Sequence, residues 1–375
     1  MKILFTGGGS GGHFYPLIAV AESLNEIAKR ENLVSAELYF MSDNPYDAEA
    51  LIENNITYVP IYAGKRRLYA SFLNFLDVFK TAWGVLMALS KVFNIYPDVI
   101  FSKGAYASFP VLMAGRLLRI PIIIHESDSV PGRTNLWASK FAMKIAVSYP
   151  DTAKFFDTSK VAYTGNPLRK SILNMTKAGA HEYFELEKNI PTIFIIGGSL
   201  GAKIINERIM DALPKLLEKY QLIHQTGKAN VLEVSKLADI VLTNNPNKTR
   251  YRIFDYLNNL SLTMAAGAAD LIISRAGSTI FEIASWGIPS IVIPITETNG
   301  NHQRINAYDY ARSGAASVIE ESNLTTNVLI GEIDRILDDK TMQGKMSVAA
   351  KNFTKPDAAD KIAREIIAIA LSHEE

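Results

Sequence analysis

Two glycine-rich loops, each directly after a short apolar run, constrain this 375-residue chain more than any other feature. Gly8-Gly9-Ser10-Gly11-Gly12 follows Lys2–Phe5, and a second glycine loop, Gly197–Ala202, follows Thr192–Ile196. A glycine turn between a strand and a helix lets the backbone approach a ligand, and N–H groups at the start of the helix can then bind an anion. Two such openings, 189 positions apart, predict two similar Rossmann-like halves.

The chain between and after these loops has the pattern of parallel α/β units. Runs that are apolar at nearly every position are typical of strands covered on both faces. They are Lys2–Phe5, Leu38–Met41, Val99–Phe101, Ile120–Ile124, Lys144–Val147, Thr192–Ile196, Gln221–His224, Ala269–Ile273 and Ser290–Ile293. Stretches with helical spacing, such as Ile18–Lys29 and Val111–Leu118, separate them. We predict an α/β fold with domains 1–162 and 163–355, and a closing helix, 356–375, that packs back on the first.

The composition excludes several classes of protein. The net charge is +1, from 39 basic and 38 acidic residues, which gives no reason to expect nucleic acid as a partner. The absence of cysteine excludes disulfides, thiolate metal sites and a cysteine nucleophile. The start of the chain lacks the features of a signal peptide. We expect no membrane-spanning helix, because that requires about 20 predominantly apolar residues in succession.

The first glycine loop matches a nucleotide-binding pattern incompletely. Gly7-x-Gly9-x-x-Gly12 has the spacing of the dinucleotide fingerprint, which also needs an acidic residue about 20 positions further on. The nearest candidate, Asp43, lies 31 residues after Gly12, so a dinucleotide oxidoreductase is the weakest interpretation. His13 directly follows the loop, where a neutral imidazole could act as a general base or have only a structural role.

A second group of polar residues follows strands of the C-terminal half. Arg275 comes directly after an apolar run and could neutralise a phosphate. Glu282 falls in the first turns of the next predicted helix, where it could accept hydrogen bonds from a ribose or simply stabilise the helix terminus. The stretch from Pro294 to Asn306 reads as a polar loop whose amides suit sugar hydroxyls, although an ordinary surface loop would look the same.

Together, in order and spacing, these motifs resemble the MurG family of glycosyltransferases over nearly the whole chain. The matching segments are Gly8–His13, Gly104 with Tyr106 and Ser108, His125-Glu126, Thr134-Asn135, Gly165–Arg169, Gly197–Ala202 with Asn206, Arg275-x-Gly277 with Glu282, and His302-Gln303 with Asn306-Ala307. Two positions depart from the family pattern. Ala105 stands where a second glycine is common, and Asp128 stands where asparagine is usual.

The resemblance implies a GT-B fold, in which two Rossmann-like domains face each other across a cleft. It implies inverting transfer of N-acetylglucosamine from UDP-GlcNAc to undecaprenyl-pyrophosphoryl-MurNAc-pentapeptide (lipid I), giving lipid II for peptidoglycan synthesis, with no cofactor. The chain contains no Asp-x-Asp triplet. We therefore expect helix N-termini, backbone N–H groups and arginine, and no catalytic metal, to stabilise the departing UDP.

The resemblance also implies roles for individual residues. His13 is the suggested base. Donor-binding roles fall on Asn135, Arg169, Gly198, Ser199, Gly201, Phe254, Arg275, Gly277, Ser278, Glu282, His302, Gln303 and Asn306. Acceptor-binding roles fall on Ser10, Gly11, Gly12, Gly104, Tyr106, Ser108, His125, Glu126 and Asp128.

A lipid acceptor implies contact with a bilayer, and Lys65–Lys91 is the candidate surface. This stretch combines aromatic and aliphatic residues with five basic residues and one acidic residue, Asp77. Such a composition suits an interfacial segment on anionic lipid, although core helices of the N-terminal half would explain the apolar residues equally well. The predicted location is peripheral, on the cytoplasmic face of the cell membrane.

Two other classes of enzyme remain open on the sequence. Another UDP-sugar transferase of the same fold, such as a diacylglycerol glycosyltransferase, would have a similar donor half. The acceptor-side residues Tyr106, Ser108, His125 and Glu126 favour the peptidoglycan enzyme. A UDP-GlcNAc epimerase acts on free sugar nucleotide and would not need the Lys65–Lys91 surface.

Overall fold

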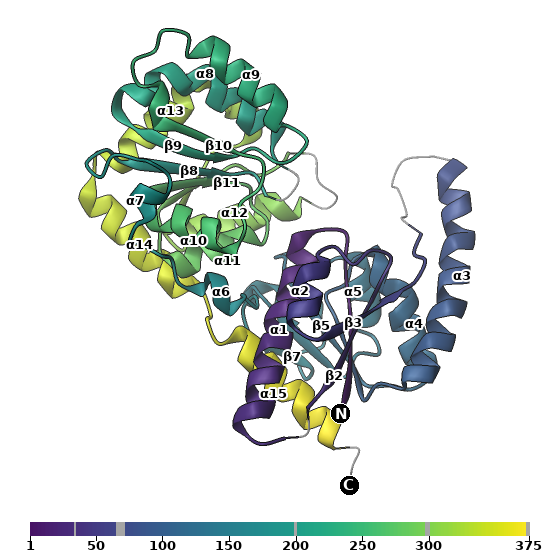
Figure 1. Cartoon of the computed structure of the whole chain (residues 1–375). Helices are drawn as coiled ribbons and strands as arrows, with labels where there is room; N and C mark the ends of the chain where they lie inside the picture. Colours follow the sequence, from purple (N-terminus) through teal and green to yellow (C-terminus); the bar gives the residue numbers. More distant parts are fainter. Residues whose placement is uncertain (34, 65–71, 199–200, 297–300, 373–375) are drawn as a thin grey trace. The chain divides into compact units, whose positions relative to one another are not determined.

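The computed structural model describes residues 1–33, 35–64, 72–198, 201–296 and 301–372, and it divides into two compact units (Figure 1). The first unit is Met1–Arg169 with Lys355–Glu375, and the second is Lys170–Thr354. The division falls after Arg169 and not after residue 162. The N–H groups of Thr164 and Gly165 both donate to the carbonyl of Val147, at 3.1 and 3.2 Å, and this holds the segment on the first sheet.

The first unit contains, among the described residues, a parallel sheet with the order β3-β2-β1-β4-β5-β6-β7. Its strands are β1 (Lys2–Thr6), β2 (Glu37–Ser42), β3 (Ile56–Pro60), β4 (Val99–Ser102), β5 (Ile122–Glu126), β6 (Lys144–Val147) and β7 (Val161–Tyr163). Its helices are α1 (Gly11–Arg30), α2 (Ala48–Glu53), α3 (Phe72–Ile95), η1 (Tyr106–Ser108), α4 (Phe109–Leu117), α5 (Arg133–Ala138), η2 (Pro150–Phe155) and α15 (Ala358–Leu371).

Helices cover both faces of this sheet because successive strand residues alternate between the faces. Ile3 and Phe5 of β1 pack in one core with apolar residues of α1 and α15, whereas Leu4 packs in the other with residues of α3 and α4. The closing helix α15 thus returns to the first unit, where it lies beside α1 (Figure 1). Burial on both faces explains why the inner strands are continuously apolar.

The second unit contains, within the described ranges, a parallel sheet with the order β10-β9-β8-β11-β12-β13. Its strands are β8 (Thr192–Ile196), β9 (Gln221–Gln225), β10 (Tyr251–Phe254), β11 (Leu271–Ser274), β12 (Ser290–Val292) and β13 (Ala316–Val318). Its helices are α6 (Lys170–Leu173), α7 (Ala180–Tyr183), α8 (Lys203–Lys219), α9 (Val231–Val241), η3 (Lys248–Arg250), α10 (Asn259–Ala268), α11 (Thr279–Trp286), α12 (His302–Arg312), η4 (Glu321–Asn323), α13 (Thr326–Leu337) and α14 (Lys340–Phe353). One face packs against α8, α9, α13 and α14, and the other against α10 and α11.

The strands that the apolar pattern predicts are the inner strands of the two sheets. The four described strands that it misses, β3, β7, β10 and β13, are the four sheet edges. Edge strands pair on one side only, and these are less deeply buried, with exposed or half-exposed residues in each. Without a continuous apolar run, a short edge strand gives little signal in the sequence.

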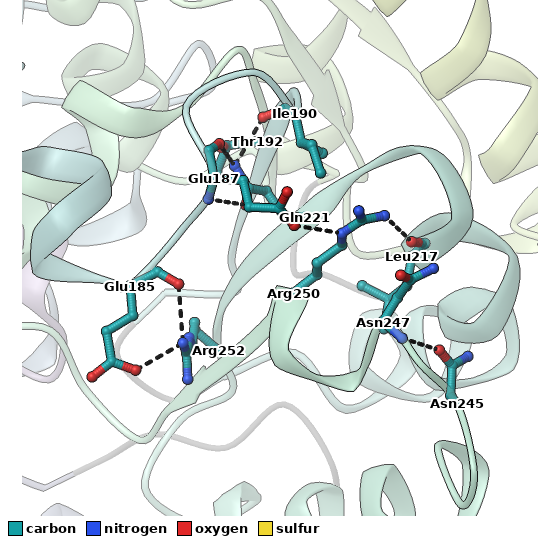
Figure 2. A network of polar contacts seen from close by, with 10 residues as sticks. All are labelled: Glu185, Glu187, Ile190, Thr192, Leu217, Gln221, Asn245, Asn247, Arg250 and Arg252. Carbon is teal, nitrogen blue, oxygen red and sulfur yellow. Dashed lines mark hydrogen bonds and ion pairs between the residues drawn. The ribbon is translucent and has the colours of Figure 1, made fainter.

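A polar network closes the amino ends of the second sheet (Figure 2). The buried Gln221 side chain accepts a hydrogen bond from the N–H of Glu187 through its carbonyl oxygen. Its amide nitrogen donates to the Glu187 carbonyl and to the Thr192 hydroxyl. Arg250 pairs with the Glu187 carboxylate, and Arg252 pairs with that of Glu185. These contacts attach the segment before β8 to β9 and β10 at the end of the sheet opposite the glycine loop.

Helix α3 differs from the other covering helices in its outer face. Its segment Asp77–Ile95 is, among the described residues, the one stretch long and apolar enough to cross a membrane by length and composition, and only 17% of it is buried. Length and composition alone do not make it a membrane-spanning helix, because a core helix can meet the same criteria, and the prediction that no helix spans a membrane is not overturned. Ala88 and Val92 pack in the same core as α4, so this helix belongs to the first unit.

Candidate active site

In each unit, the strand order reverses direction between two neighbouring strands, and the loops after those strands meet at the carboxyl edge of the sheet. In the first unit these are the loops after β1 and β4. A Cβ added to Gly8, at φ +156°, would lie 2.7 Å from the Ser42 hydroxyl, and one on Gly9 would lie 3.3 Å from the Tyr106 ring. The first glycine loop is therefore pressed against its neighbours, which only glycine allows.

The first loop leads directly into α1. Ser10 is the N-cap residue, and its side chain makes no capping hydrogen bond. The helix begins at Gly11, and Gly11, Gly12 and His13 lie in its first turn. The His13 N–H donates to the Ser10 carbonyl at 3.1 Å. The N-terminus of this 20-residue helix gives the loop the electrostatic character of an anion site.

The loop after β4 carries the predicted Gly104, Tyr106 and Ser108. Tyr106 donates to Asp43 at 2.8 Å, and burial together with that carboxylate raises the Tyr106 pKa to about 12. The Ser108 hydroxyl is buried 2.6 Å from the Gly104 carbonyl, so it supports the loop from within. Ala105 has φ +66° and ψ 173°, a conformation that is essentially restricted to glycine. The departure from the family pattern therefore introduces backbone strain.

Behind these loops lies a buried polar cluster at the end of β5. The Glu126 carboxylate accepts hydrogen bonds from the N–H groups of Asp128 and Gly132 and from the Asn135 side chain, at 2.9–3.0 Å. Burial and the charge of Asp128 raise the Glu126 pKa. His125 is fully buried, and its Nε2 lies 3.0 Å from the carbonyl of Gly165.

Sequence reasoning missed Lys103, whose Nζ lies 2.5 Å from Nδ1 of His125. A lysine placed between a buried strand and a glycine is the signal that could have identified it, because a long cation at such a position must either reach solvent or find a buried partner.

Two residues with implied donor roles, Asn135 and Arg169, belong to the first unit. Arg169 is buried, and its guanidinium stacks 3.7 Å from the centre of the Tyr15 ring. Asn135 uses its amide N–H for Glu126 and for the carbonyl of His125. Its carbonyl oxygen is buried and has no hydrogen-bond donor among the residues that the structure describes.

In the second unit, the loop after β8 is the second glycine loop. Gly201 has φ +76°, and a Cβ there would lie 2.1 Å from the Thr226 carbonyl. Gly198 has φ +83°, and no atom of the described residues lies within 4 Å of its Cβ position, which leaves the backbone open to a ligand. Ser199, predicted to contact the donor, lies outside the described residues.

A neutral chain of buried side chains supports this loop. His224 lies between the Tyr251 hydroxyl, at 2.9 Å, and Asn206 Oδ1, at 3.0 Å, and Asn206 donates to the Thr226 carbonyl. Burial lowers the His224 pKa to about 3, so the imidazole is neutral. The Phe254 carbonyl, at the end of β10, accepts from the Thr226 N–H at 2.9 Å.

The loop after β11 contains Arg275, Gly277 and Ser278 and leads into α11, which carries Glu282 in its first turn. The Arg275 guanidinium is engaged within the protein. It donates to Glu321 at 2.7 Å and to the Ile293 carbonyl at 3.1 Å. Although burial of Glu321 opposes ionisation, the hydrogen bonds from Arg275 and Thr296 hold its pKa below the usual range. The sequence did not predict Glu321 as the partner of Arg275, because the two residues are 46 positions apart.

The predicted polar loop from Pro294 to Asn306 is partly helical. His302, Gln303 and Asn306 lie on the first turns of α12, which begins at His302. Gln303 accepts from the N–H of Ile295 at 3.3 Å, and the buried Asn306 donates to the carbonyl of Ala276 at 3.1 Å. The two amides thus connect α12 to the ends of β12 and β11.

Comparison with known proteins identifies the class. Residues 3–147 match the N-terminal domain of glycosyltransferase family 28, and residues 192–362 match its C-terminal domain. The chain belongs to this family and is a glycosyltransferase.

Its relatives define the branch of the family. The chain is 36% identical to a protein of Bacillus cereus named UDP-N-acetylglucosamine–N-acetylmuramyl-(pentapeptide) pyrophosphoryl-undecaprenol N-acetylglucosamine transferase 2, over 97% of this chain and 99% of that one. A protein of Clostridium novyi with the same name but no number is 36% identical over 90% of this chain and 91% of its own length.

Solved structures agree on the fold. Acinetobacter baumannii MurG matches with a TM-score of 0.72 and 26% identity, covering 98% of this chain and 99% of that one. The UDP-GlcNAc 2-epimerase of Neisseria meningitidis, bound to UDP-GlcNAc, matches with a TM-score of 0.70 and 15% identity, covering 98% and 100%. The second likeness concerns the fold alone. The predicted GT-B fold and membership of the MurG branch are confirmed.

Proposed function

We propose that this chain transfers N-acetylglucosamine from UDP-GlcNAc to undecaprenyl-pyrophosphoryl-MurNAc-pentapeptide, with inversion at the anomeric carbon, to form lipid II. The observation that carries the proposal is the 36% identity, along nearly the whole chain, to enzymes named for this reaction. It is supported by two glycine loops at strand carboxyl ends, each suited to a phosphate group.

The resemblance to the MurG family implies the roles of the two units. The second unit binds the donor, with Glu282 on the ribose, Gln303 on the sugar hydroxyls and the open backbone at Gly198 near the diphosphate. In the first unit, the N-terminus of α1 and the loop after β4 bind the acceptor pyrophosphate. His13, in the first turn of α1, is the proposed base for the acceptor hydroxyl.

The reaction is tested by transfer of labelled GlcNAc from UDP-GlcNAc to a short-chain lipid I analogue, with diacylglycerol as competing acceptor. The expected product is the lipid II analogue alone. Activity should survive EDTA, because helix termini and arginine stabilise the leaving UDP. Transfer to diacylglycerol alone, or loss of activity in EDTA with recovery in magnesium, contradicts this mechanism.

The donor assignment is tested by Glu282→Ala. Loss of charged hydrogen bonds to the ribose should weaken UDP-GlcNAc binding by about 1–3 kcal/mol, measured by titration calorimetry. Glu233→Ala, on the exposed first turn of α9, is the matched control and should bind like the wild type. Equal affinities of both variants remove Glu282 from the donor site.

We further propose that the first unit docks on the cytoplasmic face of the membrane through α3. Val78, Phe79, Trp83, Leu86 and Phe93 are each 59–64% exposed, and their spacing places most of them along one side of the helix. Solvent-exposed aromatic and aliphatic side chains at this density are typical of an interfacial helix. The basic cluster Lys65-Arg66-Arg67, named in the sequence as part of this surface, lies outside the described residues.

Docking is tested by vesicle sedimentation with anionic lipid. The variant Phe79→Ser/Trp83→Ser/Leu86→Ser should lose most of its binding. Leu232→Ser/Ile240→Ser, which changes exposed side chains of α9 in the other unit, is the control and should bind normally. Undiminished binding of the α3 variant excludes this helix as the docking surface.

A further inference from the structure

Lys103 is the most deeply buried cation among the described residues. It follows β4 directly, and its side chain is 1% exposed. Its N–H donates to the carbonyl of Thr6 at the end of β1, and its Cβ lies 3.2 Å from the Cβ position of Gly7. The stem of the side chain therefore lies directly beneath the first glycine loop.

The ammonium group determines how the His125 imidazole is protonated. A lysine ammonium only donates hydrogen bonds, so Nδ1 of His125, 2.5 Å away, must accept. The proton of the neutral imidazole is then on Nε2, which donates to the Gly165 carbonyl at 3.0 Å. The ammonium also lies 3.4 Å from Asn166 Oδ1. Lys103 thus determines both the tautomer of His125 and its attachment to the segment 165–166.

The charge of Lys103 is balanced by carboxylates at the end of the next strand. Burial lowers the Lys103 pKa to about 7, although the charges of Glu126 and Asp128 raise it. His125 and, through it, His13 are the other titratable groups that face this cluster, and burial and the Lys103 charge hold the His125 pKa well below its usual range. Asp128 occupies the position where the family usually has asparagine, so this chain has an additional negative charge for Lys103 to balance.

We propose that Lys103 is a positioning residue for the transfer reaction, which orients His125 and balances the Glu126–Asp128 charges beneath the first glycine loop. This inference rests on the proposed function, because it assigns that loop to the diphosphate-linked acceptor. Because Lys103 is buried beneath the loop, its proposed role is indirect. It acts by holding the imidazole, the segment 165–166 and the loop after β1 in one arrangement, so that the acceptor site is formed before the acceptor arrives.

The kinetic test compares Lys103→Met with Lys140→Met, an exposed lysine of the same unit. Loss of a partner that orients a histidine should lower kcat/KM for the lipid I analogue about 10- to 100-fold in Lys103→Met. The affinity for UDP-GlcNAc, which the other unit is proposed to bind for the most part, should change much less than kcat/KM. Equal kcat/KM values for the two variants overturn the proposal.

A pH profile separates this role from a merely structural one. If the ammonium form is required, kcat/KM should fall above about pH 7, where Lys103 loses its proton. Asp128→Asn removes a charge that raises the Lys103 pKa, so its alkaline limb should move to lower pH. An alkaline limb that does not move in Asp128→Asn contradicts the proposal, and this variant keeps the test open even if Lys103→Met does not fold.

A spectroscopic measurement tests Lys103 independently of the substrate. In protein labelled with ¹⁵N-histidine, and with His125 assigned by its loss in His125→Gln, the Nδ1 resonance should titrate with a midpoint near pH 7. It should lose this titration in Lys103→Met. A pH-independent Nδ1 resonance in the wild type overturns the inference. Failure of the wild type to use lipid I, with the titration intact, refutes the proposed function and leaves the Lys103–His125 contact standing.

Discussion

Both units bury a histidine at the carboxyl end of a parallel strand, but they surround it differently. In the first unit, His125 contacts the ammonium of Lys103, and the next residue is the buried carboxylate of Glu126. In the second unit, His224 lies between a tyrosine hydroxyl and an asparagine, and all three side chains are neutral. The surroundings of His125 therefore contain charges that must be balanced, whereas the contacts of His224 are hydrogen bonds between neutral side chains.

The difference separates two ways of supporting a glycine loop. Neutral hydrogen bonds hold the loop of the second unit without depending on pH near neutrality, since the His224 pKa lies at about 3. The charged cluster costs more to bury, and replacing such groups by apolar ones is often neutral or stabilising. Charges at this position therefore suggest a requirement of the acceptor chemistry, which is the basis of the inference for Lys103.

The largest expected effect on stability is that of Glu126→Ala. It leaves three N–H donors without their acceptor and removes a carboxylate that balances the Lys103 charge. Removal of one member of a buried charged group typically costs about 3–5 kcal/mol. Hydrogen-exchange mass spectrometry under increasing urea can measure each unit separately. The free energy of unfolding should fall in the first unit only. A decrease of less than about 1 kcal/mol would mean that the charged cluster around His125 is no more sensitive than a neutral hydrogen bond.

A smaller effect is expected for Asn206→Ala in the neutral chain. It leaves the Thr226 carbonyl and the His224 imidazole each without one partner, which should lower the free energy of unfolding of the second unit by about 1–3 kcal/mol. The same exchange experiment measures it. If Asn206→Ala proves more damaging than Glu126→Ala, charge is not what distinguishes the two clusters.

The two units should also differ in the pH range over which burial affects their stability. The folded protein binds the Lys103 proton less tightly than the unfolded chain, whose lysine pKa is 10.5. The contribution of Lys103 to the free energy of unfolding should therefore rise between about pH 7 and 10.5, by at most about 1.4 kcal/mol per pH unit. His224 is also depressed, so its contribution should fall as the pH drops from 6.5 towards about 3.

Difference measurements isolate these contributions from those of other groups. The difference in free energy of unfolding between the wild type and Lys103→Met should shift progressively in favour of the wild type as the pH rises above about 7. The difference between the wild type and His224→Gln should shift against the wild type as the pH falls below 6.5. Parallel stability curves for either pair would show that the corresponding group is not protected from solvent in the folded protein.

The smallest expected effect concerns the backbone of the two loops. Ala105 adopts a glycine-only conformation in the first unit, whereas Gly198 and Gly201 occupy the positive-φ positions of the loop after β8. Ala105→Gly should relieve strain of about 1–3 kcal/mol, less the greater entropy that glycine loses on folding, for a net gain of about 1 kcal/mol. Thermal unfolding measures this gain, and Ala107→Gly, in the adjoining 3₁₀ turn, is the control that should be destabilised. A lower melting temperature for Ala105→Gly would contradict the strain.

Several features of the site could be read from the sequence because they depend on local order. The glycine loops, His13 at the start of α1 and Glu282 in the first turn of α11 follow from a strand, a turn and a helix in succession. The start of α12 at His302 could not be predicted from the sequence, because the helix is mostly polar and shows no clear apolar spacing. Contacts between distant segments were also hidden, such as Arg275 with Glu321.

The sequence by itself determined the inner strands, the two glycine loops and the family, because a doubly covered strand is apolar throughout and a turn close to a ligand requires glycine. Only the tertiary structure decided which buried polar groups meet. Lys103 and His125 lie 22 residues apart, and their contact exists because β4 and β5 are neighbours in the sheet. Burial then makes each such contact electrostatically strong, since the low-dielectric interior screens charges far less than water does.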